Sequence, residues 1–460
     1  MRAKAVNKNI VLMVVMVTSF ITPFIGAAVN LALPRISDDF KLTAVEMSWV
    51  AMSYLLSSAV FLVPVGKFAD IVGRKRIFFW GNLILAGASL LCAYAPSGNL
   101  LIAFRIVQGI GSSMVFATGI ALVTSVFPPS ERGKAIGLNV TAVYIGLSSA
   151  PIVGGFLIYW FGWHSLFFVP VIIGLPAAVA TRVAIRDEWA EAKNETFDYK
   201  GALIYLPAMT AFMFGLSKLP EYSAIILTAG GILGLLLFIR TELQATYPIL
   251  NINLFRTNRL FAFANLAALI NYATTFAVTF MLSLYLQYIK GLSPRDAGLI
   301  LVIQPIIMAI ISSWSGKLSD SRDPRILASW GMAISALGLL MLTPINSTTS
   351  TTYLVIVLAI LGVGFGLFSS PNTNSIMGSV EKKYLGLASG TVGTMRLTGQ
   401  MVSMGIATLI LHLYIGKDSI NPGNHQQFIR AMGIAFIAFA VLSVVGVWAS
   451  LKRGKISDTL

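Results

Sequence analysis

Charged residues are scarce in this chain: only 11% of its 460 residues are Asp, Glu, Lys or Arg, while 56% are hydrophobic. With a mean hydropathy of +0.81, the chain has too little polar surface to cover a water-soluble globule, which predicts a membrane protein. Cysteine and histidine are nearly absent as well. The single Cys92 excludes a disulfide within one chain, and His164, His412 and His425 lack the spacing of metal ligands. Because nucleophile motifs and phosphate-binding loops are also missing, we predict no enzyme, cofactor or metal site.

Acidic residues are the scarcer charge: 18 Asp and Glu stand against 33 Lys and Arg, a net charge of +15. In a soluble protein this excess would suggest nucleic acid as a partner. Here the basic residues lie mostly in alternate loops between apolar runs, as expected when positive loops stay in the cytoplasm. We therefore predict a multi-pass protein of the cell (plasma) membrane with both termini cytoplasmic, membrane lipid around it, and no nucleic-acid partner.

Long apolar runs recur along the whole chain, and about 20 residues suffice to cross a hydrocarbon core of roughly 30 Å. Fourteen such runs divide as six, two and six, which predicts two six-helix bundles, residues 1–185 and 259–460, and an insertion, residues 186–258. Within the insertion, the charged stretch 186–200 is expected to form a cytoplasmic linker helix ahead of two extra membrane helices. The fourteen runs lie near 10–33, 47–66, 77–95, 100–126, 135–159, 164–185, 201–218, 223–240, 260–289, 296–316, 326–344, 352–372, 384–414 and 428–451.

The two halves repeat each other. Gly66-Lys67-Phe68-Ala69-Asp70 recurs about 250 positions later as Gly316-Lys317-Leu318-Ser319-Asp320. The pairs Gly109/Gly111 and Gly362/Gly364 recur at a similar offset, whereas the two extra helices have no copy. Related membrane halves that enclose a central site are the usual construction of solute carriers, so the repeat indicates transport.

The loop after the second run continues past Asp70 to Gly73 and Arg74. Its glycines allow tight turning, and Asp70 can pair with Arg74. This pattern resembles the major facilitator superfamily, specifically its fourteen-helix drug:proton antiporter branch with tetracycline and quaternary-ammonium exporters. The resemblance covers essentially the whole chain and implies the major facilitator fold and a conformational lock at Gly66, Asp70, Gly73, Arg74 and, in the second copy, Asp320.

Two further helices carry family-like motifs. Arg105 with Gln108 in the fourth resembles a motif whose arginine is linked to proton transfer, although it could equally bond carbonyls of neighbouring helices. The fifth helix resembles the antiporter motif, in which small residues and a proline shape a seam between the halves; a plain packing helix is the alternative. The residues of that motif are Gly137, Gly146, Pro151, Gly154 and Gly155.

No Asp or Glu lies near the middle of any predicted span, so the buried carboxylate that usually carries the proton in such antiporters is missing. Asp70 and Glu46 are the weak candidates that remain. The buried charge is positive instead, from Arg105 and Arg396, which suits an anionic, zwitterionic or metal-chelated substrate better than a simple cation. The predicted cavity residues are Asn30, Tyr54, Arg105, Gln108, Asn265, Tyr272, Gln304, Asn372, Arg396 and Gln400.

We therefore expect a monomeric secondary transporter that exports amphipathic drugs or metabolites by alternating access, with a small-molecule substrate and a proton as its partners. One alternative is an exporter of lipid or anionic metabolite without a conventional embedded proton carrier. Another, of a different class, is a membrane receptor or scaffold that has kept the carrier fold without turnover.

Overall fold

The computed structural model describes residues 8–185, 187–190, 192–219, 221–319, 322–380, 385–416 and 418–454, and these residues form helices and loops without a strand. Thirteen segments are long and apolar enough to cross a membrane. The helix α7 (Tyr199–Lys218) lies alongside the spanning helix α8 (Tyr222–Glu242) and completes the set of fourteen. The chain is thus an all-α membrane protein with the predicted number of long helices.

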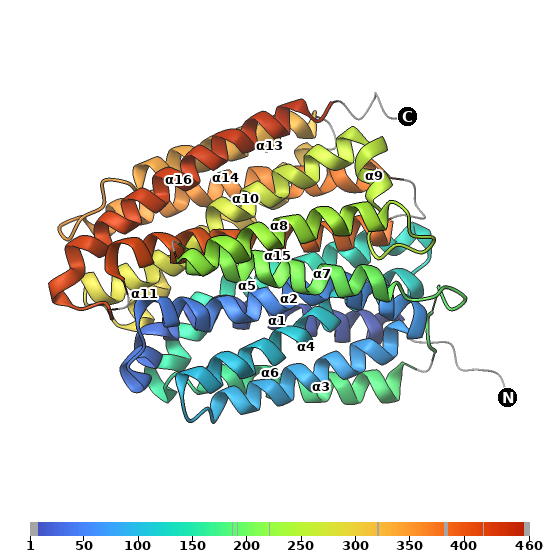
Figure 1. Cartoon of the computed structure of the whole chain (residues 1–460), viewed down its shortest axis with the longest axis horizontal. Coiled ribbons are helices and arrows are strands. Elements are labelled where there is room, and N and C mark those ends of the chain that lie inside the picture. Colours follow the sequence, from blue (N-terminus) through green and yellow to red (C-terminus); the bar gives the residue numbers. More distant parts are fainter. Residues whose placement is uncertain are drawn as a thin grey trace.

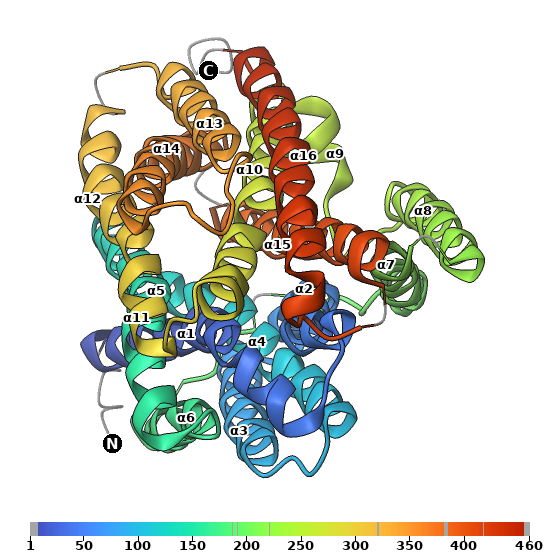
Figure 2. The same ribbon diagram turned by 90° about the vertical axis from the view of Figure 1, so that its left-hand side faces the viewer.

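The first six helices pack together as one bundle, below the centre of Figure 2. Its closest pairs are α2 with α4, α3 with α4, α1 with α5 and α3 with α6. The bounds are α1 Lys8–Phe40, α2 Ala44–Val72, α3 Arg74–Ala93, α4 Gly98–Val126, α5 Pro129–Phe161 and α6 Ser165–Ala184.

The last group of helices forms the second bundle, in the upper half of Figure 2. One span breaks into α11 and α12 because Pro305 has no N–H to donate to the carbonyl of Leu301. Another ends in a π-helical turn, Tyr285–Ile289. The bounds are α10 Arg259–Leu284, α11 Pro294–Leu301, α12 Ile303–Leu318, α13 Pro324–Met341, α14 Thr351–Gly378, α15 Leu385–Ile415 and α16 His425–Lys452, preceded by the short α9 Ile252–Thr257.

The repeated glycines occupy equivalent places in the two bundles. A Cβ on Gly111 of α4 would lie 3.0 Å from the carbonyl of Gly81 on α3, and one on Gly364 of α14 would lie 2.8 Å from that of Gly331 on α13. Both pairs let two helix backbones approach more closely than a side chain would allow. The sequence repeat therefore reflects one packing arrangement used twice.

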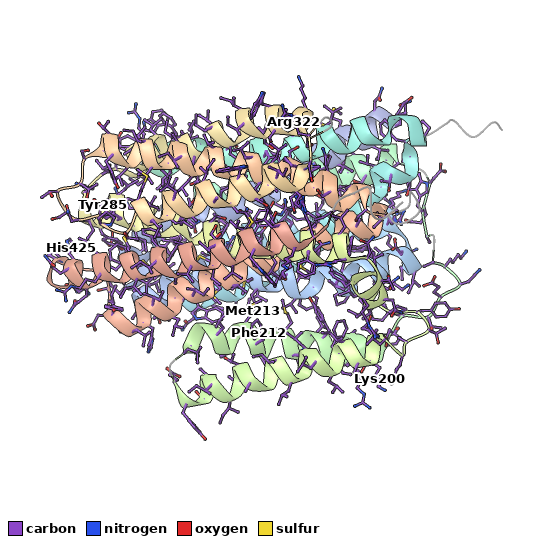
Figure 3. The ribbon with its side chains drawn as sticks, turned by 90° about the horizontal axis from the view of Figure 1, so that it is seen from above. Lys200, Phe212, Met213, Tyr285, Arg322 and His425 are labelled. Carbon is purple, nitrogen blue, oxygen red and sulfur yellow. The ribbon has the colours of Figure 1, made fainter. Side chains whose placement is uncertain are left out.

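The α7–α8 hairpin stands beside the two bundles rather than between them (Figures 2 and 3). Through α7 it touches α15 of one bundle and α2 of the other. Phe214 packs on Trp49 of α2 at 5.2 Å between ring centroids, while Met213 is fully buried. The hairpin therefore covers the α2–α15 side of the boundary between the bundles.

The expected linker helix is wrong. Residues 187–190 and 192–198 form turns, a bend and backbone without regular secondary structure, a segment we call the strap. Its polar groups form hydrogen bonds with the loop after α2. The Glu188 carboxylate accepts a hydrogen bond from the Lys75 N–H at 2.8 Å, and the Trp189 carbonyl accepts one from the Arg74 N–H at 2.9 Å. Because these tertiary bonds replace helical ones, the local charge pattern was misleading.

The chain enters α1 and leaves α16 at the same end of the molecule (Figure 1). The loop between α2 and α3 also lies there. We call this the terminal end, and the end that holds the α1–α2 connection the opposite end.

Candidate transport site

A cavity lies between the bundles, about halfway along the helices. The space between its walls measures about 1130 Å³, a figure that includes open solvent. Helices of both bundles line it: α1, α2, α4 and α5 on one side, and α10, α11, α12, α14 and α15 on the other. Six of the predicted cavity residues are among its lining residues: Asn30, Tyr54, Tyr272, Gln304, Arg396 and Gln400.

Arg396 is the only charged residue among the described residues that line the cavity. Its guanidinium lies 4.8 Å from the centre of the Phe116 ring across the boundary, and Gln400 follows one turn later on α15. The ring faces one side of the planar guanidinium and leaves its N–H groups available for a ligand. No carboxylate occurs in the described lining, so the cavity is electropositive.

Hydrogen-bonding groups surround this charge. Asn30 is 1% exposed, and neither its amide oxygen nor its nitrogen has a partner within the described structure. Amides of Gln304 and Gln400 and the phenols of Tyr54 and Tyr272 add donors and acceptors. A buried amide without hydrogen-bond partners costs free energy unless a ligand or water bonds to it. The Asn30 side chain is therefore available to hydrogen-bond a polar ligand.

Arg105 and Gln108 do not line the cavity; they lie behind its wall. The Arg105 Nε donates to the Val50 carbonyl at 3.0 Å and its Nη1 to the Gln108 amide oxygen at 2.7 Å, and Gln108 donates in turn to Ser89. Arg105 also stacks on Tyr54 at 4.5 Å from the ring centre. The arginine therefore reaches the cavity through Tyr54, whose hydroxyl donates to the Thr22 carbonyl at 2.9 Å and lies 2.8 Å from the Ser112 hydroxyl.

Asn265 and Asn372 also lie away from the cavity. Asn265 donates to the Phe261 carbonyl of its own helix, while Asn372 joins α14 to the Ala264 carbonyl of α10 at 3.1 Å. The Asn372 oxygen accepts from the buried Arg453 at 2.8 Å. Burial lowers the pKa of Arg453 to about 10, which leaves it protonated at neutral pH. These side chains hold the second bundle together at its terminal end.

The cavity also contains residues beyond the ten predicted above. Tyr144 of α5, an aromatic residue that the sequence suggests as a pocket-lining side chain, hydrogen-bonds Ser369 of α14 and joins the two bundles across the cavity wall. Phe116 provides the ring beneath Arg396. Nothing in the sequence marks Ser369 or Phe116.

Beyond the cavity, the bundles are sealed together at the opposite end. Main chains meet where Gly298 of α11 lies against the Pro151 carbonyl of α5, and a Cβ on Gly155 would lie 2.8 Å from the Pro294 carbonyl. Ser283 of α10 donates to the Asn30 carbonyl of α1 at 2.9 Å. We call these close contacts between the two bundles the seal.

The antiporter-like motif serves two boundaries. Gly146 and Gly154 face α1 within the first bundle, meeting the Phe20 carbonyl and the Ala28 side chain, whereas Pro151 and Gly155 face α11 of the second bundle. Gly137 has open space around its Cα. The motif thus combines packing inside one bundle with the seal between bundles.

The predicted lock residues lie at the terminal end. Asp70 accepts from Arg74 Nε at 2.7 Å, and Arg74 Nη1 donates to Ser125 of α4 at 2.8 Å. Gly73 has φ +128°, a backbone conformation that residues with a Cβ rarely adopt, and it lies against the Glu188 carboxylate. Gly66 lies against Ala117 of α4. Asp320 lies outside the described residues.

Comparison with known proteins assigns the fold. The family model described as Major Facilitator Superfamily matches residues 15–404 and 264–457. The chain belongs to the Major Facilitator Superfamily. It is 31% identical to the riboflavin transporter RibZ of Clostridioides difficile (strain 630), over 85% of each chain. It is 28% identical to the multidrug resistance protein Stp of Mycobacterium tuberculosis (strain CDC 1551 / Oshkosh), over 84% of this chain and 73% of Stp.

Among solved structures, an inward-facing, unoccupied bacterial homologue of the human lysosomal transporter Spinster matches this superfamily member with a TM-score of 0.69. The match covers 98% of each chain at 16% identity, and it supports the fold alone. The family and its relatives are transporters, which confirms the predicted fold, the resemblance and the expectation that the chain is not an enzyme. It is a multi-pass membrane transporter with a small-molecule substrate.

Proposed function

We propose that this transporter exports amphipathic organic molecules across the plasma membrane by alternating access, as a monomer with both termini cytoplasmic. The observation that carries the proposal is a cavity shared by both bundles and sealed at one end by contacts between them. A rocking motion of residues 1–185 against residues 259–460 would break that seal and form one at the terminal end. Residues 186–258 form the insertion beside this boundary.

The cavity chemistry favours substrates with an aromatic body and an anionic or strongly hydrogen-bonding group. Arg396 supplies the only positive charge of the described lining, amides and phenols supply neutral partners, and Phe116, Phe276 and Phe365 supply aromatic faces. A bare cation would find no counter-charge there. Relatives named for riboflavin transport and for multidrug resistance fit a site for planar organic molecules.

Proton antiport is the proposed source of energy, although the proton carrier differs from the usual one. Glu46 is occupied in a capping box, where its carboxylate accepts the Thr43 amide at 2.8 Å. Asp70 remains, paired with Arg74 at the lock. Protonation of Asp70 by a proton arriving from the opposite end would remove the charge that holds Arg74 and favour opening of the lock, and release of that proton at the terminal end would restore the pair.

The first test uses everted membrane vesicles with an imposed pH gradient, with riboflavin and the organic cation ethidium as probes. We expect riboflavin to accumulate, ethidium to accumulate less, and a protonophore to stop both. Accumulation that survives the protonophore would contradict antiport while leaving transport in place. Failure of a panel of aromatic anions and neutral heterocycles to accumulate at all would contradict the function.

A second candidate, export of an anionic metabolite or lipid driven by its own gradient or the membrane potential, is favoured by one observation. The described cavity holds a guanidinium and no carboxylate to exchange protons beside it. In that case an imposed voltage would drive substrate-dependent current at any pH, which the same vesicles can measure.

A substitution at Arg105 distinguishes two roles for this residue, positioning Tyr54 in the cavity wall and binding the substrate itself. Arg105→Ala removes the stack beneath Tyr54 and leaves Gln108 without its donor, so we expect transport of every probe to fall together, by about tenfold or more. Initial rates in vesicles measure this, with protein folding checked by monodisperse gel filtration. A loss confined to anionic probes would contradict the positioning role.

A further inference from the structure

The α7–α8 hairpin has two acidic side chains at its base, at the terminal end of the molecule. Asp198 is the N-cap of α7, and Glu242 is the last residue of α8. Figure 3 labels Lys200 at this end of the hairpin. Glu242 is only 3% exposed, unusual for a carboxyl group that has no ion pair in the described structure.

One oxygen of each carboxyl group accepts a hydrogen bond from a backbone N–H group. Asp198 Oδ1 accepts from the Gly201 N–H at 2.8 Å, and Glu242 Oε2 accepts from the Leu250 N–H at 2.8 Å. The other two oxygens, Asp198 Oδ2 and Glu242 Oε1, are buried and have no donor among the described residues. Both converge on Gly201, where a Cβ would lie 2.4 Å from Glu242 Oε1 and 2.6 Å from Asp198 Oδ2.

Two facing carboxylates without a cation repel each other, and burial of their free oxygens strengthens that repulsion. Among the described residues, Asp198 is the ionisable group whose charge acts on Glu242. Lys200, Arg240 and Tyr247 are exposed on the hairpin and its following loop, and Glu195 of the strap is bound to Lys67. The pair therefore requires a positive species between its free oxygens.

We propose that Asp198 and Glu242 form a proton-binding site, in which one proton bridges Asp198 Oδ2 and Glu242 Oε1. A proton satisfies both oxygens with a single charge-assisted hydrogen bond. A metal ion fits poorly, because Ca²⁺ takes about six to eight oxygen ligands, whereas this pair has two free oxygens and its other two are already bonded to backbone N–H groups. The described residues also hold no larger group of metal-ligating side chains.

The bridging proton joins three segments: the start of α7, the end of α8 and the loop at Leu250. The strap runs from Asp198 to the lock loop, with Phe197 edge-on to Phe68 at 5.7 Å and Glu195 paired with Lys67. Loss of the proton would push the two carboxylates apart and loosen this connection. The hairpin base is thus a pH-sensitive anchor for the lock loop, separate from the cavity and independent of the substrate proposed above.

Infrared spectroscopy of the purified protein tests the site directly, without a transport assay. At neutral pH we expect the C=O absorption of a protonated carboxyl group, shifted in D₂O. It should disappear in both Glu242→Gln and Asp198→Asn, and remain in the control Glu221→Gln at the other end of the same hairpin. Absence of the band in the native protein, or its survival in both variants, would overturn the proposal.

Stability provides a second measurement in case a band is obscured. The folded pair keeps a proton that carboxyl groups of the unfolded chain release above about pH 5, so the unfolding constant should rise up to tenfold per pH unit until the folded pair also loses its proton. Glu242→Gln keeps a donor toward Asp198 and should flatten this part of the dependence, while Glu221→Gln should not. Parallel native and Glu242→Gln profiles from about pH 5 to about pH 7 would contradict the shared proton.

Discussion

Gly298→Val is expected to lower transport severalfold or more while leaving both bundles folded. Its new side chain would occupy the place of the Pro151 carbonyl of the other bundle, so the strain arises only when the opposite end is sealed. Overpacking of about 1–3 kcal/mol lowers the population of the sealed state roughly 5- to 150-fold. Transport should fall in proportion, and a cysteine introduced at Gln304 should become accessible to a polar thiol reagent from the opposite end.

Gly87→Val is the matched control for this substitution. Gly87 lies on the exposed face of α3 with open space around its Cα, so the same added volume meets nothing in the protein. If Gly87→Val transports at the native rate while Gly298→Val transports more slowly, the effect comes from the seal. Native transport by Gly298→Val would mean that this contact is absent from the working cycle.

Arg396→Ala is expected to cause the second large loss, and one selective for substrate charge. It removes the only charged group of the described cavity lining. A hydrogen bond to a charged group contributes about 1.5–3 kcal/mol, so binding of an anionic probe should weaken about 10- to 150-fold. Neutral probes that stack on Phe116 should lose less. Tryptophan-fluorescence titration of the purified protein measures the affinities.

Arg396→Lys separates geometry from charge at the same position. Lysine keeps the positive charge but cannot form the planar two-point contact of a guanidinium, nor the same stack over Phe116. We expect an intermediate affinity for anions. If the alanine, lysine and native proteins bind an anionic probe equally, Arg396 does not anchor the substrate.

The fold could be predicted from the sequence because the strongest signals are long-range regularities. Apolar runs of spanning length, the loop at Gly66 and the glycine pairs each repeat across the chain, and membrane helices satisfy their own backbone bonds. The linker was mispredicted because its conformation depends on tertiary contacts rather than on a repeated local pattern. Glu188 and Trp189 bond to the α2–α3 loop, and no local pattern reveals a tertiary partner.

The site was predicted less evenly. Polar residues on helical stripes, such as Asn30 and Arg396, indicated the cavity side of their helices. The same logic cannot separate a residue that faces the cavity from one that faces a neighbouring helix, as Arg105 and Asn372 demonstrate. Ser369 needed the three-dimensional structure, because its importance lies in a partner 225 positions away in the chain, Tyr144.

Distance measurement between spin labels on the two bundles tests the alternating-access account most directly. Cys92 is buried and can be replaced by alanine, after which labels at Asn99 and Ser347 report on the opposite end, and labels at Arg76 and Arg322 report on the terminal end. Across conditions that change substrate occupancy or pH, the account predicts that one pair moves apart as the other approaches. If both distances stay fixed, or both change in the same direction, the bundles do not rock about the cavity.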